Sequence, residues 1–156
     1  KISPSTARSL GVRADPLEKV RRRFLHDTTR GPIDREVRPF VRALNATDWI
    51  VTTSSCSGLH EGAMRRGVGY VALAVRTIDV VRLASLLNLL QLEGGEGSAW
   101  AFECELVFEE VIAGSCDPVE YPGVAFFSVS MELWAGTEAE GKQQLLSLAK
   151  LIPSVA

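Results

Sequence analysis

Apolar residues recur at helical spacing in four parts of the chain, and each part predicts an amphipathic helix. The expected helices cover about residues 16–27, 33–46, 78–92 and 138–152. Their apolar positions include Leu17, Val20 and Phe24 in the first, Val37, Phe40, Val41 and Leu44 in the second, and Leu145, Leu148, Ala149 and Ile152 in the last. Thr137 and Glu140 have the spacing of a capping box, which favours a helix start there.

Shorter runs of apolar residues predict four strands. Residues 70–75 are nearly all apolar, which is typical of a strand buried on both faces. Residues 100–108 alternate between apolar residues and glutamate, which indicates a half-exposed strand. Residues 49–53 and 124–133 are the other two expected strands, and the last is the expected hairpin partner of 100–108.

The order of these elements is α-α-β-β-α-β-β-α, and strand 70–75, helix 78–92 and strand 100–108 form a β-α-β unit. We therefore expect a single α/β domain over residues 15–156, with residues 1–14 as a flexible tail. Its sheet is expected to be mixed, with about four or more strands and with helices mainly on one face. The sequence contains neither a G-x-G-x-x-G motif nor a P-loop, which argues against a Rossmann domain.

Composition narrows the class of protein. Of 156 residues, 46% are hydrophobic and 23% charged, which is typical of a globular domain and excludes general disorder. The apolar runs are far shorter than the roughly 20 residues of a membrane span, so we expect no membrane partner. The three cysteines are an odd number and form no C-x-x-C pair, which favours a reducing, cytoplasmic location. Cys56 and His60 alone do not make a metal site.

Charge is distributed unevenly along the chain. Residues 1–76 hold 14 Lys or Arg and 7 Asp or Glu, whereas residues 77–156 hold 3 and 12. Because phosphate is attracted to basic surfaces, we expect any RNA contact to come from the first half. Helical spacing predicts candidate RNA-binding residues on exposed sides of two neighbouring helices. They are Arg21, Arg22, Arg23, Arg35, Arg38 and Arg42. In the alternative interpretation, the two charged halves pair with each other or with a second subunit of an oligomer.

Residues 52–58 are unusually rich in hydroxyl groups. The segment Thr-Thr-Ser-Ser-Cys-Ser-Gly follows the first expected strand and is interpreted as a loop. Hydroxyls and free backbone N–H groups of such a loop can surround an anion or a polar ligand, and Gly58 permits close approach or a positive φ. The alternative is a Ser/Thr turn that satisfies its own backbone.

The same segment carries a resemblance to a known family. Phe24-Leu-His-Asp27, Arg30-Gly31-Pro-Ile-Asp34 and the segment 48–58 occur in the order found in the methyltransferases of wybutosine synthesis, the third enzyme of that tRNA-modification pathway. The family's hallmark is S-x-S-S-C-x-G-R. Thr52, Ser54, Ser55, Cys56 and Gly58 fit this hallmark, with Thr for the first Ser. The resemblance covers about residues 17–58.

The resemblance implies methyl transfer from S-adenosylmethionine to a ring nitrogen of the wyosine-type base beside the anticodon of phenylalanine tRNA. It also implies an α/β fold that is not the Rossmann methyltransferase fold. The cofactor-binding candidates are then Thr52, Ser54, Ser55, Cys56, Ser57 and Gly58. The catalytic candidates are Asp27, Asp34 and Ser55, with either aspartate accepting a proton or orienting a base amine. The alternative for the two aspartates is a helix end and an N-cap, and for Cys56 a nucleophilic role.

The chain departs from the family at three places. Leu59 replaces the hallmark Arg, and Arg76 and Phe108 stand where the family carries histidines. These departures indicate a divergent member. They leave two alternatives to an enzyme, namely a non-catalytic nucleic-acid or nucleotide-binding domain on the same scaffold, and an oligomeric structural domain.

Overall fold

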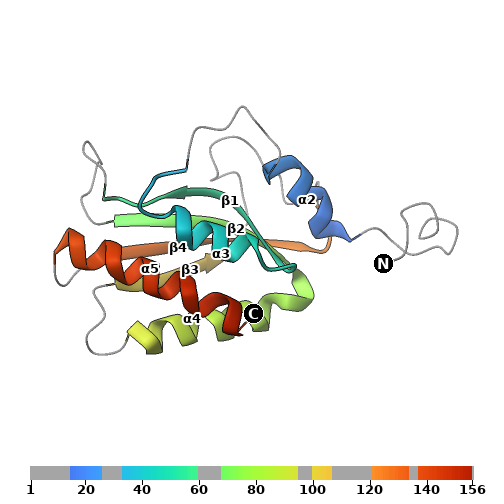
Figure 1. Ribbon diagram of the computed structural model, residues 1–156. Coiled ribbons are helices and arrows are strands. Elements are labelled where there is room, and N and C mark those ends of the chain that lie inside the picture. The colour runs from blue at the N-terminus through green and yellow to red at the C-terminus, as the bar shows by residue number, and fades with distance from the viewer. Residues whose placement is uncertain are drawn as a thin grey trace, which may run out of the picture.

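The computed structural model describes residues 15–25, 33–59, 68–94, 100–106, 121–133 and 137–155. These residues form four α-helices, one 3-10 turn and four strands (Figure 1). In chain order they are α2 (Pro16–Leu25), α3 (Arg38–Asn45), β1 (Ile50–Cys56), β2 (Val68–Arg76), η1 (Thr77–Asp79), α4 (Val80–Gly94), β3 (Trp100–Leu106), β4 (Val124–Leu133) and α5 (Glu138–Val155). The predicted tail, Asp27 and Phe108 lie outside the described residues.

The second helix is shorter than the predicted 33–46. Residues 35–37 form turns, and α3 begins at Arg38 with Pro39 in its first turn. Proline lacks an N–H and fixes φ, so it is tolerated in the first turn of a helix but not in its interior. A helix running through Pro39 from residue 33 was therefore the wrong interpretation of an otherwise correct apolar pattern.

The sheet has the strand order β1-β2-β4-β3, and every pair of neighbouring strands is antiparallel. The prediction of a mixed sheet was wrong. The β2-α4-β3 unit exists, and its two strands point the same way, but β4 lies between them and pairs with both. The predicted pairing of residues 100–106 with 124–133 is confirmed.

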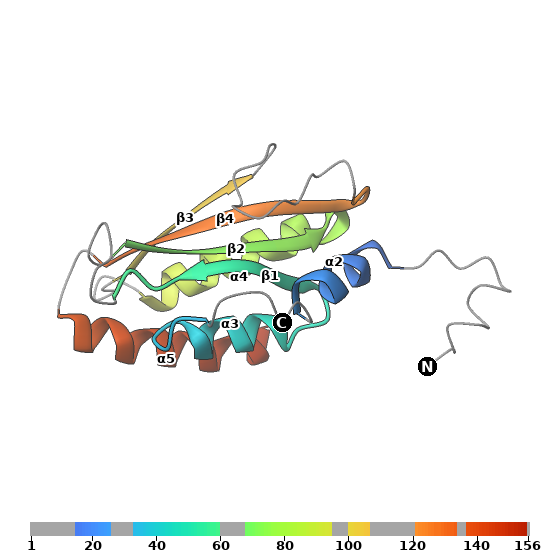
Figure 2. The ribbon, with the colours of Figure 1, turned by 90° about the horizontal axis from the view of Figure 1, so that it is seen from above.

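Helices cover the two faces of the sheet unequally (Figures 1 and 2). The apolar sides of α3, α4 and α5 form one large core with alternate residues of the strands, such as Ile50, Val71 and Val129. A smaller core on the other face joins Leu17, Val20 and Phe24 of α2 to the intervening strand residues, among them Val51, Ala74 and Phe126. Helices thus lie mainly on one face, as predicted, and α2 covers one end of the other.

Candidate functional site

The hydroxyl-rich segment is largely a strand and not the predicted loop. β1 continues through Cys56, with an irregularity in its register between Thr52 and Ser54. Ser54 pairs with Ala72 and Cys56 with Tyr70, whereas Ser55 pairs with Val71. Successive strand residues point to opposite faces. Ser54 and Cys56 therefore lie on the face that carries α2, and Ser55 lies on the face of the larger core.

A small polar cluster lies on the α2 face at the end of β1. The hydroxyls of Ser54 and Tyr70 are 2.9 Å apart, and Tyr70 is 39% exposed. The register continues this row across the sheet, because Tyr70 pairs with Ser130 of β4. We call Ser54, Cys56, Tyr70 and Ser130 the hydroxyl row. The sequence patterns did not single out Tyr70 or Ser130, because only the strand register brings them into one row with Cys56 of β1.

The hydroxyl row suits a cationic or neutral polar ligand. Its described side chains carry no positive charge, and Glu132, two residues beyond Ser130 on the same face, is exposed. S-adenosylmethionine is a sulfonium cation with hydroxyl and amine groups, and neutral hydroxyls can bind such groups without repelling its charge. The residues present therefore fit this cofactor.

Ser57 and Gly58 form a tight turn after β1. Ser57 is fully buried, and its backbone N–H donates to Asp34 Oδ2 at 3.0 Å, while its Oγ lies 3.5 Å from the same oxygen. Gly58 has φ +66, and a Cβ on it would lie 2.0 Å from the carbonyl oxygen of Val68. The expected positive φ and close approach at Gly58 are confirmed. The positive φ and the missing side chain of Gly58 allow the end of β1 to approach the backbone of β2 at Val68.

Two threonines of the segment are buried. Thr52 is 5% exposed, its N–H donates to Asn45 Oδ1 at 2.8 Å, and its Oγ1 accepts from Asn45 Nδ2 at 2.6 Å. These bonds connect α3 to β1. Thr53 Oγ1 is buried without a hydrogen-bond partner among the described residues. Thr52 is thus part of the scaffold behind the hydroxyl row, which differs from its predicted place in a cofactor loop.

The three catalytic candidates are not brought together. Asp27 lies outside the described residues. The carboxylate of Asp34 binds the Ser57 turn, and its main-chain carbonyl accepts from Arg38 N–H at 3.0 Å. Ser55 is half-buried on the face away from Ser54 and Cys56. The structure therefore gives Asp34 a positioning contact with the hallmark segment.

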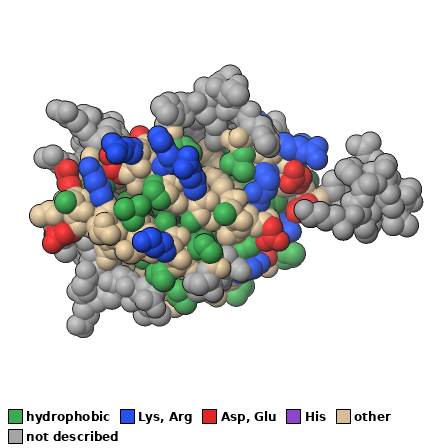
Figure 3. All heavy atoms as spheres, viewed as in Figure 1, with side chains coloured by type: hydrophobic (Ala, Val, Ile, Leu, Met, Phe, Trp, Pro, Cys, Tyr) green, Lys and Arg blue, Asp and Glu red, His purple; other side chains and the backbone are tan. Residues whose placement is uncertain are grey.

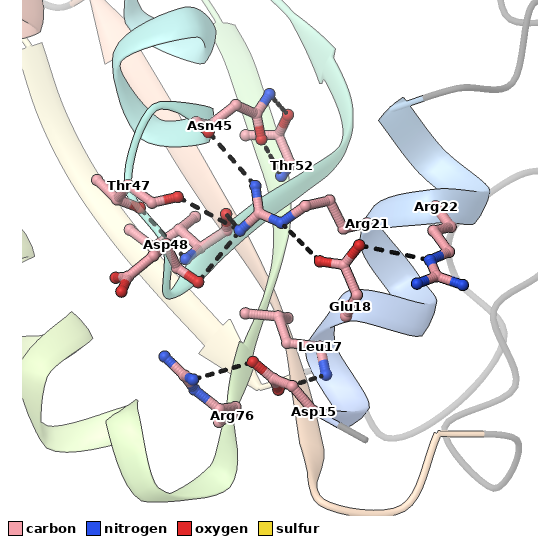
Figure 4. A network of polar contacts seen from close by, with 11 residues as sticks. Asp15, Leu17, Glu18, Arg21, Arg22, Asn45, Thr47, Asp48, Thr52 and Arg76 are labelled. Carbon is pink, nitrogen blue, oxygen red and sulfur yellow. Dashed lines mark hydrogen bonds and ion pairs between the residues drawn. The ribbon is translucent and has the colours of Figure 1, made fainter. Parts of the chain in front are cut away.

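Arg21 is the centre of an internal network (Figure 4). Its guanidinium donates to the carbonyls of Asn45, Thr47, Asp48 and Ile50 at 3.2–3.4 Å, and its side chain is only 20% exposed. It ties α2 to the connection between α3 and β1. The prediction that Arg21 lies on an exposed helix side was wrong, because helical spacing does not show which neighbouring carbonyls a long side chain reaches.

The other candidate RNA-binding arginines lie on two faces of the molecule. Arg22 is 74% exposed beside Glu18, and Arg23 donates to the Tyr121 hydroxyl at 2.8 Å, both on α2. Arg35, Arg38 and Arg42 belong to α3 and its preceding turn, on the opposite side of the sheet. The prediction that these two helices are neighbours is therefore wrong. Figure 3 shows Lys and Arg side chains over the region of α3 and α5, with Asp and Glu toward the ends of this view.

Two of the family departures have structural roles. Arg76 donates to Asp79 at 2.7 Å and to Asp15 at 3.0 Å, which joins the start of α2 to the end of β2. The hydrogen bond with Asp79, followed by the charge of Asp15, raises the pKa of Arg76 above its ordinary value. Leu59, in place of the hallmark Arg, is 5% exposed within the larger core. Phe108 lies outside the described residues.

Neither a metal site nor a membrane span is found in the part of the chain that the structure describes. These residues hold no group of three His, Cys, Asp or Glu side chains suited to a metal ion. Their helices also lack the length and apolar character needed to cross a bilayer.

Comparison with known proteins connects the hallmark segment to a family. The family model described as methyltransferase TYW3 matches residues 13–59. The match confirms the resemblance to the wybutosine-pathway methyltransferases over the part of the chain that holds α2, α3 and β1. Comparison with curated proteins and with solved structures gives no significant match.

Proposed function

We propose that the protein transfers a methyl group from S-adenosylmethionine to a ring nitrogen of the wyosine-type base beside the anticodon of phenylalanine tRNA. The observation that carries the proposal is the family match over residues 13–59, which ends on the hallmark segment. The match supports a methyltransferase of tRNA wybutosine synthesis, and the donor and the particular tRNA are our proposals. The cysteine content favours a cytoplasmic enzyme.

The hydroxyl row is the proposed contact surface for the cofactor and the acceptor base. S-adenosylmethionine supplies an activated methyl group and its own leaving group, so the protein needs chiefly to bind and orient. Ser54 and Tyr70 hold one another at 2.9 Å and present hydroxyls that can donate to or accept from a polar ligand. Asp34 keeps the turn at Ser57 in place, and Asn45 keeps β1 against α3 through Thr52.

Isothermal calorimetry with S-adenosylmethionine, with and without phenylalanine tRNA carrying the precursor base, tests this proposal. The parent protein should bind the cofactor and methylate the tRNA. Ser54→Ala combined with Tyr70→Phe should weaken cofactor binding at least about tenfold, which corresponds to the loss of about one hydrogen bond. Ser147→Ala on the exposed side of α5 is the matched control and should bind as the parent does.

Cys56 provides a second test of the mechanism. We propose a polar contact for its half-exposed thiol and no covalent intermediate, so Cys56→Ser should keep measurable activity. A methylated Cys56 detected by mass spectrometry after incubation with cofactor would contradict that role. Absence of cofactor binding by the parent protein, with and without tRNA, would contradict the methyltransferase proposal as a whole.

A non-catalytic RNA-binding protein is the second candidate function. The observation that favours it is Arg76, which stands where the family carries a histidine and is held by Asp15 and Asp79. Because the Arg76 guanidinium is engaged in two ion pairs, it stabilises the junction of α2 and β2 rather than contacting a reacting base. This candidate predicts tRNA binding without cofactor binding, which the same calorimetry distinguishes.

A further inference from the structure

The middle of the surface formed by α3 and α5 carries more positive than negative charge. Residues 37–47 contain no Asp or Glu, and Glu140 is the last acidic residue of the chain. The charged side chains of this surface are Arg35, Arg38, Arg42, Lys142, Lys150 and Glu36. Glu36, the one carboxylate among them, lies 3.7 Å from Lys142 and is 19% exposed, whereas Lys142 is 43% exposed. Five cations therefore lie along the middle of this surface beside one largely covered anion, whereas Asp48, Glu138 and Glu140 lie toward its ends.

The two helices run side by side in the same direction. A groove of about 460 Å³ between them is lined by Arg35, Glu36, Pro39, Lys142 and Leu146. Further along, a pocket of about 240 Å³ is lined by Ala43, Ala46, Thr47, Asp48, Trp49 and Pro153. Residue numbers thus increase in the same direction along α3 and α5. Lys150, between Leu146 and Pro153, therefore falls at the level of Arg42, between Pro39 and Ala46.

This alignment places cations on both sides of one seam. Residues four apart on a helix are separated by about 6 Å along its axis, and packed helices lie about 8–10 Å apart. Arg38 and Arg42 are four apart on α3, and Lys142 and Lys150 are eight apart on α5. The charges therefore repeat along the surface at intervals suited to an extended polyanion. We call the side chains Arg35, Arg38, Arg42, Lys142 and Lys150 the basic seam.

The cations of α2 do not extend the basic seam. α2 packs on the opposite face of the sheet, Arg21 is used internally, and Arg22 lies beside Glu18. The end of the basic seam lies next to the hallmark segment instead. Asp34, whose carboxylate holds Ser57, directly precedes Arg35 of the groove. A polyanion bound along the seam would therefore reach the Ser57 turn at the end of β1, on the face opposite the hydroxyl row.

We propose that the basic seam is the docking surface for the phosphate backbone of RNA, with lysines from the acidic half of the sequence as part of it. An RNA strand has a dense and regular row of charges, and arginine pairs well with phosphate. Among the described residues the seam offers few large apolar contacts, chiefly Leu146 and Ile33, each 39% exposed, which favours a polyanion over an acidic protein. That the RNA is tRNA rests on the proposed function.

The test is the salt dependence of RNA binding, which requires no cofactor. Fluorescence anisotropy with labelled phenylalanine tRNA is measured between about 50 and 200 mM salt for the parent, Arg42→Gln, Lys150→Gln and the double variant. Each lost phosphate contact should flatten the slope of log K against log salt by about 0.7–0.9, and the double variant by about twice as much. Arg22→Gln on α2 is the matched control, since it removes the same charge from the opposite face.

Four results would overturn the proposal. They are absence of tRNA binding by the parent at low salt, unchanged slopes in both seam variants, an equal loss in Arg22→Gln, and equal displacement of tRNA by poly-glutamate of matched charge. Thermal midpoints of all variants should match the parent, because the substituted side chains are exposed. If the methyltransferase proposal is wrong, the parent protein will not bind the cofactor, but these slopes will still be as expected. The two failures are therefore distinguishable.

Discussion

Gly58 occupies a place where no side chain fits. Its φ is +66, and a Cβ would approach the Val68 carbonyl oxygen to 2.0 Å. Gly58→Ala should therefore lower the free energy of unfolding by at least about 2 kcal/mol, because the left-handed conformation alone costs about 1–2 kcal/mol and the backbone must also move. Urea unfolding measures this change.

Gly123 provides the matched control for Gly58. It has φ +85, but a Cβ there would meet, among the described residues, just Pro16, with Cγ at 3.4 Å and Cβ at 3.9 Å. Gly123→Ala should cost only the conformational part, about 1–2 kcal/mol. If the two variants were equally stable, the close approach of β1 and β2 at Gly58 would have no energetic weight.

Arg21 contributes to stability through hydrogen bonds to several main-chain carbonyls, most of them partly buried. Its guanidinium lies 3.2 Å from the carbonyl oxygens of both Asp48 and Ile50, and the side chain is largely covered. Arg21→Met should lower the free energy of unfolding by about 1.5–3 kcal/mol, since charge-assisted bonds are lost and the carbonyls keep their desolvation cost. Arg22→Met, at a 74% exposed position of the same helix, should change it by less than about 0.5 kcal/mol. A similar loss in both variants would show that α2 is held only by its apolar side.

At the scale of elements, α5 begins with the predicted capping box. Thr137 N–H donates to Glu140 Oε2 at 2.6 Å, and Glu140 N–H donates to Thr137 Oγ1 at 3.3 Å. Hydrogen bonds from the Thr137 backbone, and then from its side chain, lower the pKa of Glu140 from its ordinary 4.5. The charged carboxylate is thus the stabilising form. Its contribution is complete above pH 4.5 and is lost as the pH falls through the lowered pKa.

Thr137→Ala separates the two hydrogen bonds of this box. The substitution removes the hydroxyl but keeps the backbone N–H, so the pKa of Glu140 should rise only part of the way to its ordinary value. The helix should lose about 1 kcal/mol of stability through the missing cap. A pH titration of the Glu140 carboxyl carbon by NMR checks the pKa, and an unchanged value would mean that the hydroxyl does not reach Glu140 in solution.

For the whole molecule, the strand order predicts where the backbone opens last. β2 and β4 are the inner strands and pair along the whole of Val68–Arg76. Their backbone groups have partners on both sides, and both core layers pack on them, so their amides open only when much of the domain unfolds. Native-state hydrogen exchange should show the slowest amides at inner-strand positions such as Leu73 and Phe127. Slower exchange in β1 than in β2 would contradict this order.

The large-scale division of charge is also a property of the folded molecule. Arg21, Arg38 and Lys150 come from three distant parts of the sequence, yet only Arg38 and Lys150 belong to the same surface. The expectation that RNA contacts come only from the first half rests on net charge along the chain. The net charge of the second half does not reveal that α5, after Glu140, is free of acidic residues and packs beside α3.

The amino-acid sequence by itself determined the elements, their apolar sides and the family resemblance. Periodicity is a local property, so Leu17, Phe40 and Leu145 could be placed in helix cores without knowledge of their partners. The hallmark at 52–58 could likewise be recognised from residue order alone.

Only the tertiary structure decided how that hallmark is used. The register of β1 separates Ser55 from Ser54 and Cys56, and the pairing with β2 adds Tyr70, because strand side chains alternate and register depends on distant residues. The insertion of β4 between β2 and β3 makes the sheet antiparallel, a choice that the order of elements leaves open. The carbonyls around Arg21 are likewise assembled from residues 45–50, so burial of that charge depends on packing that no helical spacing encodes.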